Sequence, residues 1–355
     1  MIPESNNNSM SSRKKIVFSL VLLGLCVGLI EGTLRLFMPN ISPMPVLPLG
    51  IGQYDPDLGW CPKPGAIASS DRFDLTVEYK VNSKGLRGPL IPYERTPGTF
   101  RILLLGDSQT YGYGVPIEKH FSHLLPGYFK NVEVVNLGVS GYGVDQELLI
   151  YRKKGQRFQP DLVISFVPHY KAHRHMHSRR WSKEKPHFIL QDGELIIQNT
   201  PVPNKNSMPQ IVENTHNWLQ MNSTTYRTGL YFWERILVRF RENPADVEYN
   251  QYLRDNEDPA FLRELHSLGG AIIRATAEEV EQHGSAYMLA SSIPELIAMA
   301  KESEILHLDT SLALNNPAFE LPQNHSHINE AGNGVLAWEL AKLLKQNNLV
   351  PEEHW

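Results

Sequence analysis

Arg101-Ile-Leu-Leu-Leu-Gly-Asp-Ser108 is a short apolar run that ends in a Gly-Asp-Ser turn. Similar apolar runs follow at residues 132–137, 161–167, 286–290 and 305–309, and helical patterns lie at 146–154, 259–283, 295–301 and 330–346. Short strands that are buried on both faces and alternate with helices are typical of a parallel sheet covered by helices on both sides. The sequence therefore predicts an α/β domain built on a five-stranded parallel sheet.

The Gly-Asp-Ser turn also marks a candidate site, because ligands of such sheets bind at the carboxyl ends of the strands. A strand-to-helix turn can present the Ser108 hydroxyl at this edge, with backbone N–H groups pointing to the same place. Serine alone is a poor nucleophile and needs a base within hydrogen-bonding distance. Taken by itself, the motif fits equally well a turn in which Asp107 and Ser108 merely cap the next helix.

The composition is that of an ordinary globular protein. The chain has 355 residues, 41% of them hydrophobic, and its 34 basic and 38 acidic residues give a formal net charge of −4. This balance excludes dependence on a strong basic field, so no nucleic-acid partner is expected. The two cysteines, Cys26 and Cys61, make neither a disulfide scaffold nor a four-cysteine zinc site.

The N-terminus has the pattern of a membrane anchor. Basic residues 13–15 precede an uncharged run from 16 to 30, which reaches a spanning length of roughly 20 residues only if it continues to about residue 38. Glu31 and Arg35 lie four apart on one helical face and can pair there. The alternative is a buried core helix at the start of a soluble protein.

The flanks of this run set the expected topology. No small-x-small cleavage site follows it, which favours an uncleaved signal anchor over a cleaved signal peptide. The positive-inside rule leaves residues 1–15 as a cytoplasmic tail. We therefore expect a transmembrane signal anchor at 16–38 and a single-pass protein of the bacterial inner membrane, with the bulk of the chain periplasmic or otherwise extracytoplasmic.

The remaining chain divides into a lead-in and a core. Residues 39–98 are rich in Pro and Gly and are expected to form a stem with short strands, not an independent domain. Residues 99–348 form the α/β domain, which an insertion at 171–257 interrupts. Within the insertion, 187–197 predicts a β-hairpin because Asp192-Gly193 is a strong two-residue turn signal, and 226–241 predicts a helix. Such an insertion can serve as a lid or a substrate wall.

Three motifs, in order along the chain, carry a family resemblance: Gly106-Asp107-Ser108, Asn136-Leu-Gly-Val-Ser-Gly141 and His327-x-Asn-x-x-Gly332. Together they resemble the SGNH/GDSL hydrolases over about residues 101–344. Two stem motifs, Asp57-Leu-Gly-Trp60 and Asn82-Ser-Lys-Gly-Leu-Arg87, resemble those of membrane-anchored bacterial members. The resemblance implies a flavodoxin-like three-layer αβα fold and ester chemistry, and we expect no metal or other cofactor.

The resemblance also implies a role for each matching residue. Ser108 matches the nucleophile and supplies one oxyanion N–H, Gly141 matches the second oxyanion donor, and His327 matches the general base that later acts as acid. These roles agree with the chemistry of a neutral imidazole and of N–H donors aimed at a developing oxyanion. Asp107 and Asn136 are expected to be structural residues near the site.

Two positions depart from the family pattern. The block that usually ends strand three with an oxyanion-hole Asn reads Val167-Pro-His-Tyr170 here, so His169 either donates one N–H in its place or is a loop residue. Asn324 stands where the family has the acid of Asp-x-x-His, and it can orient His327 without supplying a full charge. Loss of one oxyanion donor costs roughly 10²–10³-fold in other enzymes, so the two positions put normal hydrolytic speed in question.

A run of histidines follows the third strand: His169, His173, His175 and His177. We expect a solvated polar loop. Two other interpretations stay open. Alternating histidines on an extended segment can hold a transition metal. With the basic residues Lys171, Arg174, Arg179 and Arg180, the same segment can bind an anionic saccharide or lipid headgroup.

These observations predict an extracytoplasmic serine esterase, deacetylase or O-acyltransferase that acts through an acyl-serine intermediate on an ester-bearing small molecule or saccharide. Water as acceptor gives a hydrolase, and a sugar hydroxyl gives a transferase. An extracytoplasmic anchor suits acetylated envelope polysaccharide or exopolysaccharide, although the sequence holds no substrate signature. The alternative, favoured by His169 and Asn324, is a catalytically degenerate binding or scaffold protein in envelope polysaccharide assembly.

Overall fold

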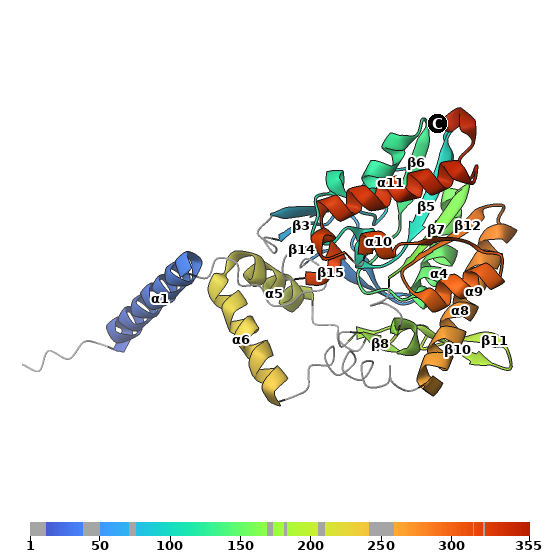
Figure 1. Cartoon of the computed structure of the whole chain (residues 1–355). Coiled ribbons are helices and arrows are strands. Elements are labelled where there is room, and N and C mark those ends of the chain that lie inside the picture. Colours follow the sequence, from blue (N-terminus) through green and yellow to red (C-terminus); the bar gives the residue numbers. More distant parts are fainter. Residues whose placement is uncertain are drawn as a thin grey trace, which may run out of the picture. The chain divides into compact units, whose positions relative to one another are not determined.

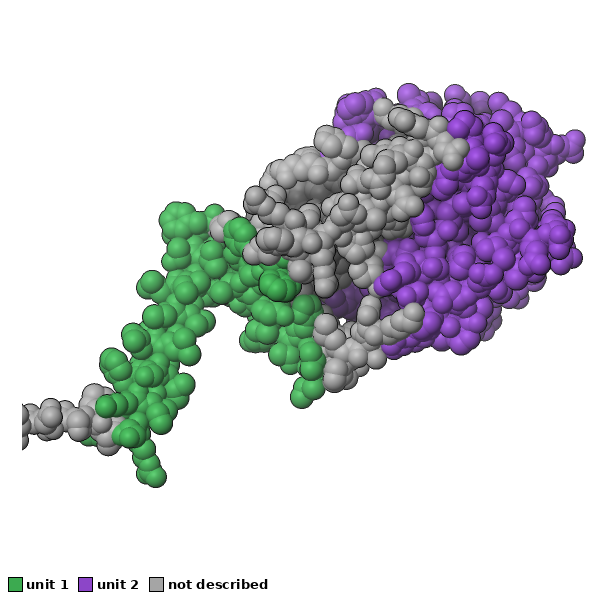
Figure 2. Space-filling view, turned by 90° about the horizontal axis from the view of Figure 1, so that it is seen from below, with its two compact units in different colours: residues 1–44, 209–241 green, residues 45–208, 242–355 purple. Residues whose placement is uncertain are grey.

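The computed structural model describes residues 12–37, 50–70, 76–168, 173–180, 183–204, 210–240, 259–314, 316–321 and 324–355 (Figure 1). Contacts divide the chain into two compact units (Figure 2). The first unit contains residues 1–44 and 209–241, and the second contains 45–208 and 242–355. The residues of the predicted insertion are thus shared between the two units, while the described residues of the predicted stem belong to the second.

The second unit is built on a five-stranded parallel sheet with the order β13-β12-β7-β5-β6. The strands are β5 (Phe100–Leu105), β6 (Val132–Asn136), β7 (Leu162–Val167), β12 (Ala286–Ser291) and β13 (Leu306–Asp309). Numbered along the chain, these strands follow the order 2-1-3-4-5, which is the flavodoxin-like order. The predicted fold class is confirmed.

Helices cover both faces of the sheet, because side chains of each strand alternate between the faces. Leu103 and Leu105 share one buried cluster with residues of α4 (Val144–Lys153), α8 (Pro259–Gln282) and α9 (Pro294–Glu302). Ile102 and Leu104 share a second cluster with α3 (Phe121–Leu124) and α11 (Glu330–Gln346). The result is a three-layer αβα arrangement (Figure 1).

Short elements connect and extend this core. The helices and 3-10 turns are α2 (Ser108–Tyr111), η2 (Ile117–Lys119), η3 (Leu125–Tyr128), η4 (Gly155–Phe158), η6 (Arg174–Met176), α10 (Ser311–Leu314), η7 (Pro317–Phe319) and η8 (Glu352–His354). The antiparallel strand pairs are β1 (Gly52–Asp55) with β2 (Gly59–Pro62), β3 (Ile67–Ser70) with β4 (Val77–Lys80), β8 (Arg179–Arg180) with β9 (Lys183–Glu184), β10 (His187–Gln191) with β11 (Glu194–Gln198), and β14 (Glu320–Leu321) with β15 (Asn324–Ile328).

The β10–β11 hairpin follows from its turn. Asp192 and Gly193 have φ of 53° and 85°, as a two-residue turn of the primed type requires at both central positions. The register pairs Gln191 with Glu194 across this turn. The hairpin predicted at 187–197 is therefore present.

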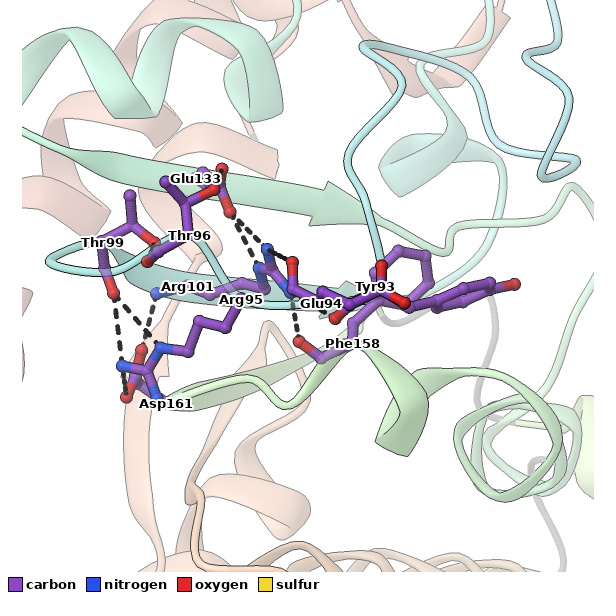
Figure 3. Close-up of polar contacts among 9 residues, drawn as sticks. All are labelled: Tyr93, Glu94, Arg95, Thr96, Thr99, Arg101, Glu133, Phe158 and Asp161. Atoms are coloured by element: carbon purple, nitrogen blue, oxygen red, sulfur yellow. Dashed lines mark hydrogen bonds and ion pairs between the residues drawn. The ribbon is translucent and has the colours of Figure 1, made fainter.

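A polar network holds the lead-in to the amino edge of the sheet (Figure 3). Arg101, fully buried at the start of β5, donates to Glu133 Oε2 at 2.7 Å and 2.9 Å and to the Tyr93 carbonyl at 3.0 Å. Asp161 accepts the Arg101 backbone N–H at 2.7 Å and pairs with Arg95. This network lies at the end of β5 opposite Ser108, so it braces the sheet and leaves the carboxyl edge free for the site.

The described part of the first unit consists of α1 (Ser12–Phe37), α5 (Gln210–Asn222) and α6 (Thr224–Phe240). Within the described residues, α1 is the one helix long and apolar enough to cross a membrane, and no residue of its apolar window is buried. This is compatible with the anchor predicted at 16–38, and α6 contains most of the helix predicted at 226–241.

Candidate active site

Ser108 lies where the sequence places it, at the first position of α2 directly after β5. Asp107 caps this helix, its Oδ1 accepting the Gln109 N–H at 3.0 Å, and Gly112 ends the helix with φ of 84°. Both Asp107 and Ser108 are buried, with 0% and 5% of their surfaces exposed. The capping turn and the candidate nucleophile are thus the same structure, so the two interpretations of the motif do not exclude each other.

His327 comes from the other end of the domain to meet Ser108. Its Nε2 lies 2.7 Å from Ser108 Oγ, within the range of a hydrogen bond. The imidazole lies on β15, with its ring centroid 5.1 Å from that of Tyr113. The next residue, Ile328, donates its N–H to Gln109 Oε1 at 3.3 Å, which joins β15 to α2. A serine and a histidine that are 219 residues apart therefore form one pair.

The end of β15 is fixed by the cap of α11. Asn329 is the N-cap and accepts the Gly332 N–H at 3.0 Å. A Cβ on Gly332 would lie 2.9 Å from Cβ atoms of Ile328 and Phe319, so only glycine fits at this position. The sequence motif His-x-Asn-x-x-Gly thus encodes a strand end, a helix cap and a close contact.

The loop after β6 packs directly against the Ser108 turn. The Val139 N–H donates to the Gly106 carbonyl at 3.0 Å, and Gly141 has φ of 88°. A Cβ on Gly138 would lie 2.5 Å from backbone atoms of Thr110 and Tyr111, so glycine is needed there for the close approach of loop and helix.

Asn136 connects the loop after β6 to α2 through its side-chain amide. Its Oδ1 accepts the Gly138 N–H at 2.9 Å, and its Nδ2 donates to the Thr110 carbonyl at 2.5 Å. The strand order, the Ser108–His327 pair and this loop reproduce the arrangement that the three motifs imply. The core has a flavodoxin-like αβα fold with this serine–histidine pair at the carboxyl edge of its sheet.

Two further residues contact the site in ways that the sequence did not predict. His120 is fully buried and its Nε2 lies 2.8 Å from the Gln109 carbonyl, while its Nδ1 lies 2.7 Å from Ser122 Oγ. Burial lowers the pKa of His120 to about 3, so the ring is neutral at ordinary pH. The ring is joined to α2 by its contact with the Gln109 carbonyl, which no motif records.

The second is Arg174, from the histidine run. Its Nη1 donates to Asp107 Oδ2 at 2.7 Å and to the Tyr142 carbonyl at 3.1 Å. One guanidinium therefore joins the residue before Ser108 to the residue after Gly141. Its side chain is 6% exposed and that of Asp107 is 0% exposed.

The expectation of a solvated polar loop is wrong for this part of the histidine run. His173 and His175 are 1% and 3% exposed, and His175 Nε2 lies 2.9 Å from the Leu265 carbonyl. Burial lowers their pKa values to about 2 and about 4. Among the described residues no group of three His, Cys, Asp or Glu side chains lies close enough to hold a metal ion.

Two predicted site residues cannot be placed. His169, the candidate substitute for the oxyanion Asn, lies outside the described residues, and so does the side chain of Asn324. The backbone of Asn324 begins β15, opposite Leu321. Their predicted roles stay predictions.

Residues of the predicted stem complete the surroundings of the site. Trp60 Nε1 donates to the Ser140 carbonyl at 3.0 Å, and the Tyr142 hydroxyl donates to the Trp60 carbonyl at 2.5 Å. Arg87 donates to the Tyr111 carbonyl at 3.1 Å and to that of Val115 at 2.7 Å. The motifs that contain Trp60 and Arg87 thus hold the Gly141 loop and the end of α2.

Burial around Arg87 has an electrostatic cost. The side chain is 3% exposed, and this burial lowers the pKa of its guanidinium. Its guanidinium carbon lies 4.4 Å from the ring centroid of Tyr79, a cation–π contact that offsets part of the lost hydration. Arg87 therefore serves the end of α2 and the segment after it as a buried donor of hydrogen bonds.

Comparison with known proteins gives a likeness in fold. No family model and no curated protein matches the chain. Solved structures that it resembles include a member of the lipolytic protein G-D-S-L family from Veillonella parvula (12% identity, 70% of this chain, 100% of that chain, TM-score 0.37). A second is the psychrotrophic esterase EstA from Pseudoalteromonas sp. (10% identity, 70% of this chain, 98% of that chain, TM-score 0.37). A third is a catalytic mutant of the acetylxylan esterase Axe2 from Geobacillus stearothermophilus (15% identity, 69% of this chain, 94% of that chain, TM-score 0.36).

Proposed function

We propose that the chain is an esterase or O-acyltransferase that works through an acyl-serine intermediate on Ser108. The observation that carries the proposal is the 2.7 Å distance between Ser108 Oγ and His327 Nε2 at the carboxyl edge of the sheet. A hydroxyl within hydrogen-bonding distance of an imidazole is the arrangement that activates a serine nucleophile.

The chemistry follows from this geometry. His327 Nε2 accepts the proton of Ser108 Oγ as the oxygen attacks the ester carbonyl, and the imidazolium then donates that proton to the leaving alcohol. The acyl group is left on Ser108 Oγ. In the second half, His327 accepts a proton from water or from a sugar hydroxyl as its oxygen attacks the acyl-serine carbonyl. The imidazolium then returns that proton to Ser108 Oγ as the acyl–Oγ bond breaks, which releases the acid or a new ester and restores the free serine.

Two backbone donors are proposed for the oxyanion of each tetrahedral intermediate, the N–H groups of Ser108 and Gly141. Support comes from the close packing of their two segments, in which Gly138 meets the backbone of Thr110 and Tyr111. The Arg174 guanidinium, which bonds Asp107 Oδ2 and the Tyr142 carbonyl, fixes the residues adjacent to both donors. Donors that are held rigidly and point to the charge that develops in the transition state lower the activation barrier most.

A fluorophosphonate probe tests the proposal directly, because it labels only an activated serine. We expect covalent labelling of the full chain at Ser108, none in Ser108→Ala, and a large loss of labelling in His327→Gln. The control is Ser83→Ala, which removes an exposed serine of the lead-in and should label as the parent does. Absence of labelling in the parent protein would favour the alternative, a degenerate SGNH-fold binding protein.

Location and substrate are further parts of the proposal. We propose that α1 anchors the chain in the bacterial inner membrane, with the second unit on the extracytoplasmic side; we call this second unit, which contains Ser108 and His327, the catalytic unit. The apolar, unburied surface of α1 and the basic residues 13–15 support this proposal. Protease added to intact spheroplasts should then degrade the catalytic unit. Survival of that unit until the cells are lysed would contradict this topology. An ester-bearing small molecule or saccharide, such as acetylated polysaccharide, stays the predicted substrate.

A further inference from the structure

In the first unit, Glu31 of α1 binds the start of α6. Its Oε1 accepts the Thr224 N–H at 2.7 Å, and its Oε2 accepts the Thr225 N–H at 2.9 Å and the Ser223 hydroxyl at 2.9 Å. The two N–H groups are donors that a helix leaves unsatisfied at its first turn, where the helix dipole also favours a negative charge. A carboxylate from a distant helix thus caps α6.

Arg35 completes this polar contact, which we call the Glu31 clamp. Arg35 Nε donates to Glu31 Oε1 at 2.8 Å, and its Nη2 donates to the Asn222 carbonyl at the end of α5 at 2.7 Å. The clamp therefore joins the last turns of α1 to both helices of the insertion. In a helix that crosses a membrane, ionisable residues occur where they are paired. Here Glu31 and Arg35 pair with each other, and residues 222–225 supply their further hydrogen-bond partners.

The two helices that the clamp holds present large apolar side chains to the outside. On α5, Ile211 and Trp218 are 76% and 59% exposed, and their spacing of seven places them on one helical face. On α6, Phe232 and Trp233 are 47% and 58% exposed. Exposed apolar surface of this kind marks an interaction site in a soluble environment or contact with a membrane.

We propose that α5 and α6 lie in the membrane interface, at the end of α1 away from its basic residues 13–15. The proposal rests on α1 as a membrane span and not on the chemistry of Ser108. Its support is continuity, because the clamp places the start of α6 beside the last turns of a helix whose apolar surface is itself uncovered. Trp and Phe on amphipathic helices are typical of the interface between headgroups and acyl chains.

This arrangement gives the first unit two kinds of membrane contact, a span and an interfacial helix pair. The chain crosses between the units at residues 44–45, 208–209 and 241–242. The first connection follows α1, and the other two lead into and out of the part of the insertion that contains α5 and α6. The insertion therefore acts as a second tether between the catalytic unit and the membrane, in addition to α1.

Spin labels on the full chain in nanodiscs of phosphatidylethanolamine and phosphatidylglycerol test the proposal. Both native cysteines are first removed by Cys26→Ala and Cys61→Ala. One spin label is then attached to the cysteine introduced by Trp233→Cys. A matched label is placed at Trp338→Cys, on α11 of the catalytic unit, where the native side chain is 49% exposed. Microwave power saturation of each label is measured once with molecular oxygen, which concentrates in lipid, and once with a water-soluble nickel complex. The two measurements give the collision rate of the label with each reagent.

We expect the label at position 233 to collide mainly with oxygen and the label at 338 mainly with the nickel complex. Preference for the nickel complex at both positions would overturn the proposal. Shielding of position 233 from both reagents would also overturn it, because a protein surface, such as a second copy of the chain, would then cover α6.

The Glu31 clamp is tested in the same experiment. Glu31→Leu removes the acceptors from the start of α6 and should raise collisions with the nickel complex at position 233 several-fold. The control is Gly32→Ala, whose added Cβ meets no atom within 4 Å and should change nothing. An unchanged profile in Glu31→Leu would show that the clamp does not hold α6 in place. Fluorophosphonate labelling of Ser108 in each variant separates this result from any failure of the catalytic proposal.

Discussion

Arg174 forms an ion pair with Asp107, the residue that precedes the candidate nucleophile Ser108. Replacing Arg174 by methionine tests whether this ion pair stabilises the fold and positions Ser108. Methionine keeps an unbranched apolar side chain but removes the guanidinium from Asp107 Oδ2, 2.7 Å away, and from the Tyr142 carbonyl. The Asp107 carboxylate would then remain buried, with 0% of its side chain exposed.

The burial of both side chains sets the magnitude. Removing one partner of a buried ion pair typically costs about 3–5 kcal/mol, because it leaves an uncompensated charge in a low-dielectric interior. At about 2–4 °C per kcal/mol for a domain of 150–250 residues, the melting temperature of Arg174→Met should fall by about 6–20 °C. The control Arg179→Met breaks a pair with Glu184 whose arginine is 62% exposed, and it should cost at most about 1 kcal/mol.

Two assays separate stability from positioning. Thermal unfolding of the full chain in detergent, followed by near-ultraviolet circular dichroism, measures the loss of stability. The rate of fluorophosphonate labelling, measured well below the melting temperature, reports whether Ser108 is still presented to His327. We expect Arg174→Met to slow labelling even where the variant is fully folded, since the guanidinium joins the residues adjacent to both proposed oxyanion donors.

The double variant Arg174→Met, Asp107→Asn provides the decisive comparison. It removes both charges and keeps an oxygen that can accept the Gln109 N–H, so it should recover much of the stability that either single change loses. The coupling energy from the double-mutant cycle should reach about 2–3 kcal/mol. Additive effects of the two changes, together with unchanged labelling in Arg174→Met, would refute the reasoning.

Three further substitutions test the packing of the site. Gly138→Ala places a Cβ 2.5 Å from the Thr110 backbone and should cost at least about 1–3 kcal/mol and abolish labelling, whereas Gly127→Ala, which meets no atom within 4 Å, should do neither. Trp60→Phe removes a buried N–H···O bond and should lower stability by about 1–3 kcal/mol in urea unfolding; an unchanged midpoint would contradict this. Burial lowers the pKa of His120 to about 3 in the folded chain, so when the pH decreases below the ordinary histidine pKa the unfolded chain takes up a proton that the folded chain does not, and the free energy of unfolding decreases. His120→Gln should reduce this pH dependence by up to about 1.4 kcal/mol per pH unit, which an acid titration of the unfolding free energy measures.

The features that local sequence determines are those that could be predicted. Strands such as Phe100–Leu105 are buried on both faces and read as continuous apolar runs, and the Asp192-Gly193 turn needs only its two residues. The Ser108–His327 pair joins distant parts of the chain, yet each residue lies at a strand-to-helix junction with its own cap, so each motif could be found separately.

Burial that depends on tertiary partners could not be predicted. Charge and histidine content made the segment around Arg174 look like a solvated loop. The partners that make its burial tolerable, Asp107 Oδ2 for Arg174 and the Leu265 carbonyl for His175, come from β5–α2 and α8. His120 is a similar case, since its two hydrogen-bond partners include a backbone carbonyl that carries no residue-type signal.

The lead-in contributes contacts to the site that its composition does not reveal. Its Pro and Gly content predicts a stem with short strands, and within it Trp60 and Arg87 donate to the buried carbonyls of Ser140 and Tyr111. Each of those acceptors would cost about 1–3 kcal/mol if it were left buried without a donor. Ile51, with 0% exposure, shares a hydrophobic cluster with Tyr111 of α2. A fragment that began at residue 99 would therefore retain all five strands but lose the groups that hold the serine turn, so we expect a chain with a formed site to need Trp60 and Arg87.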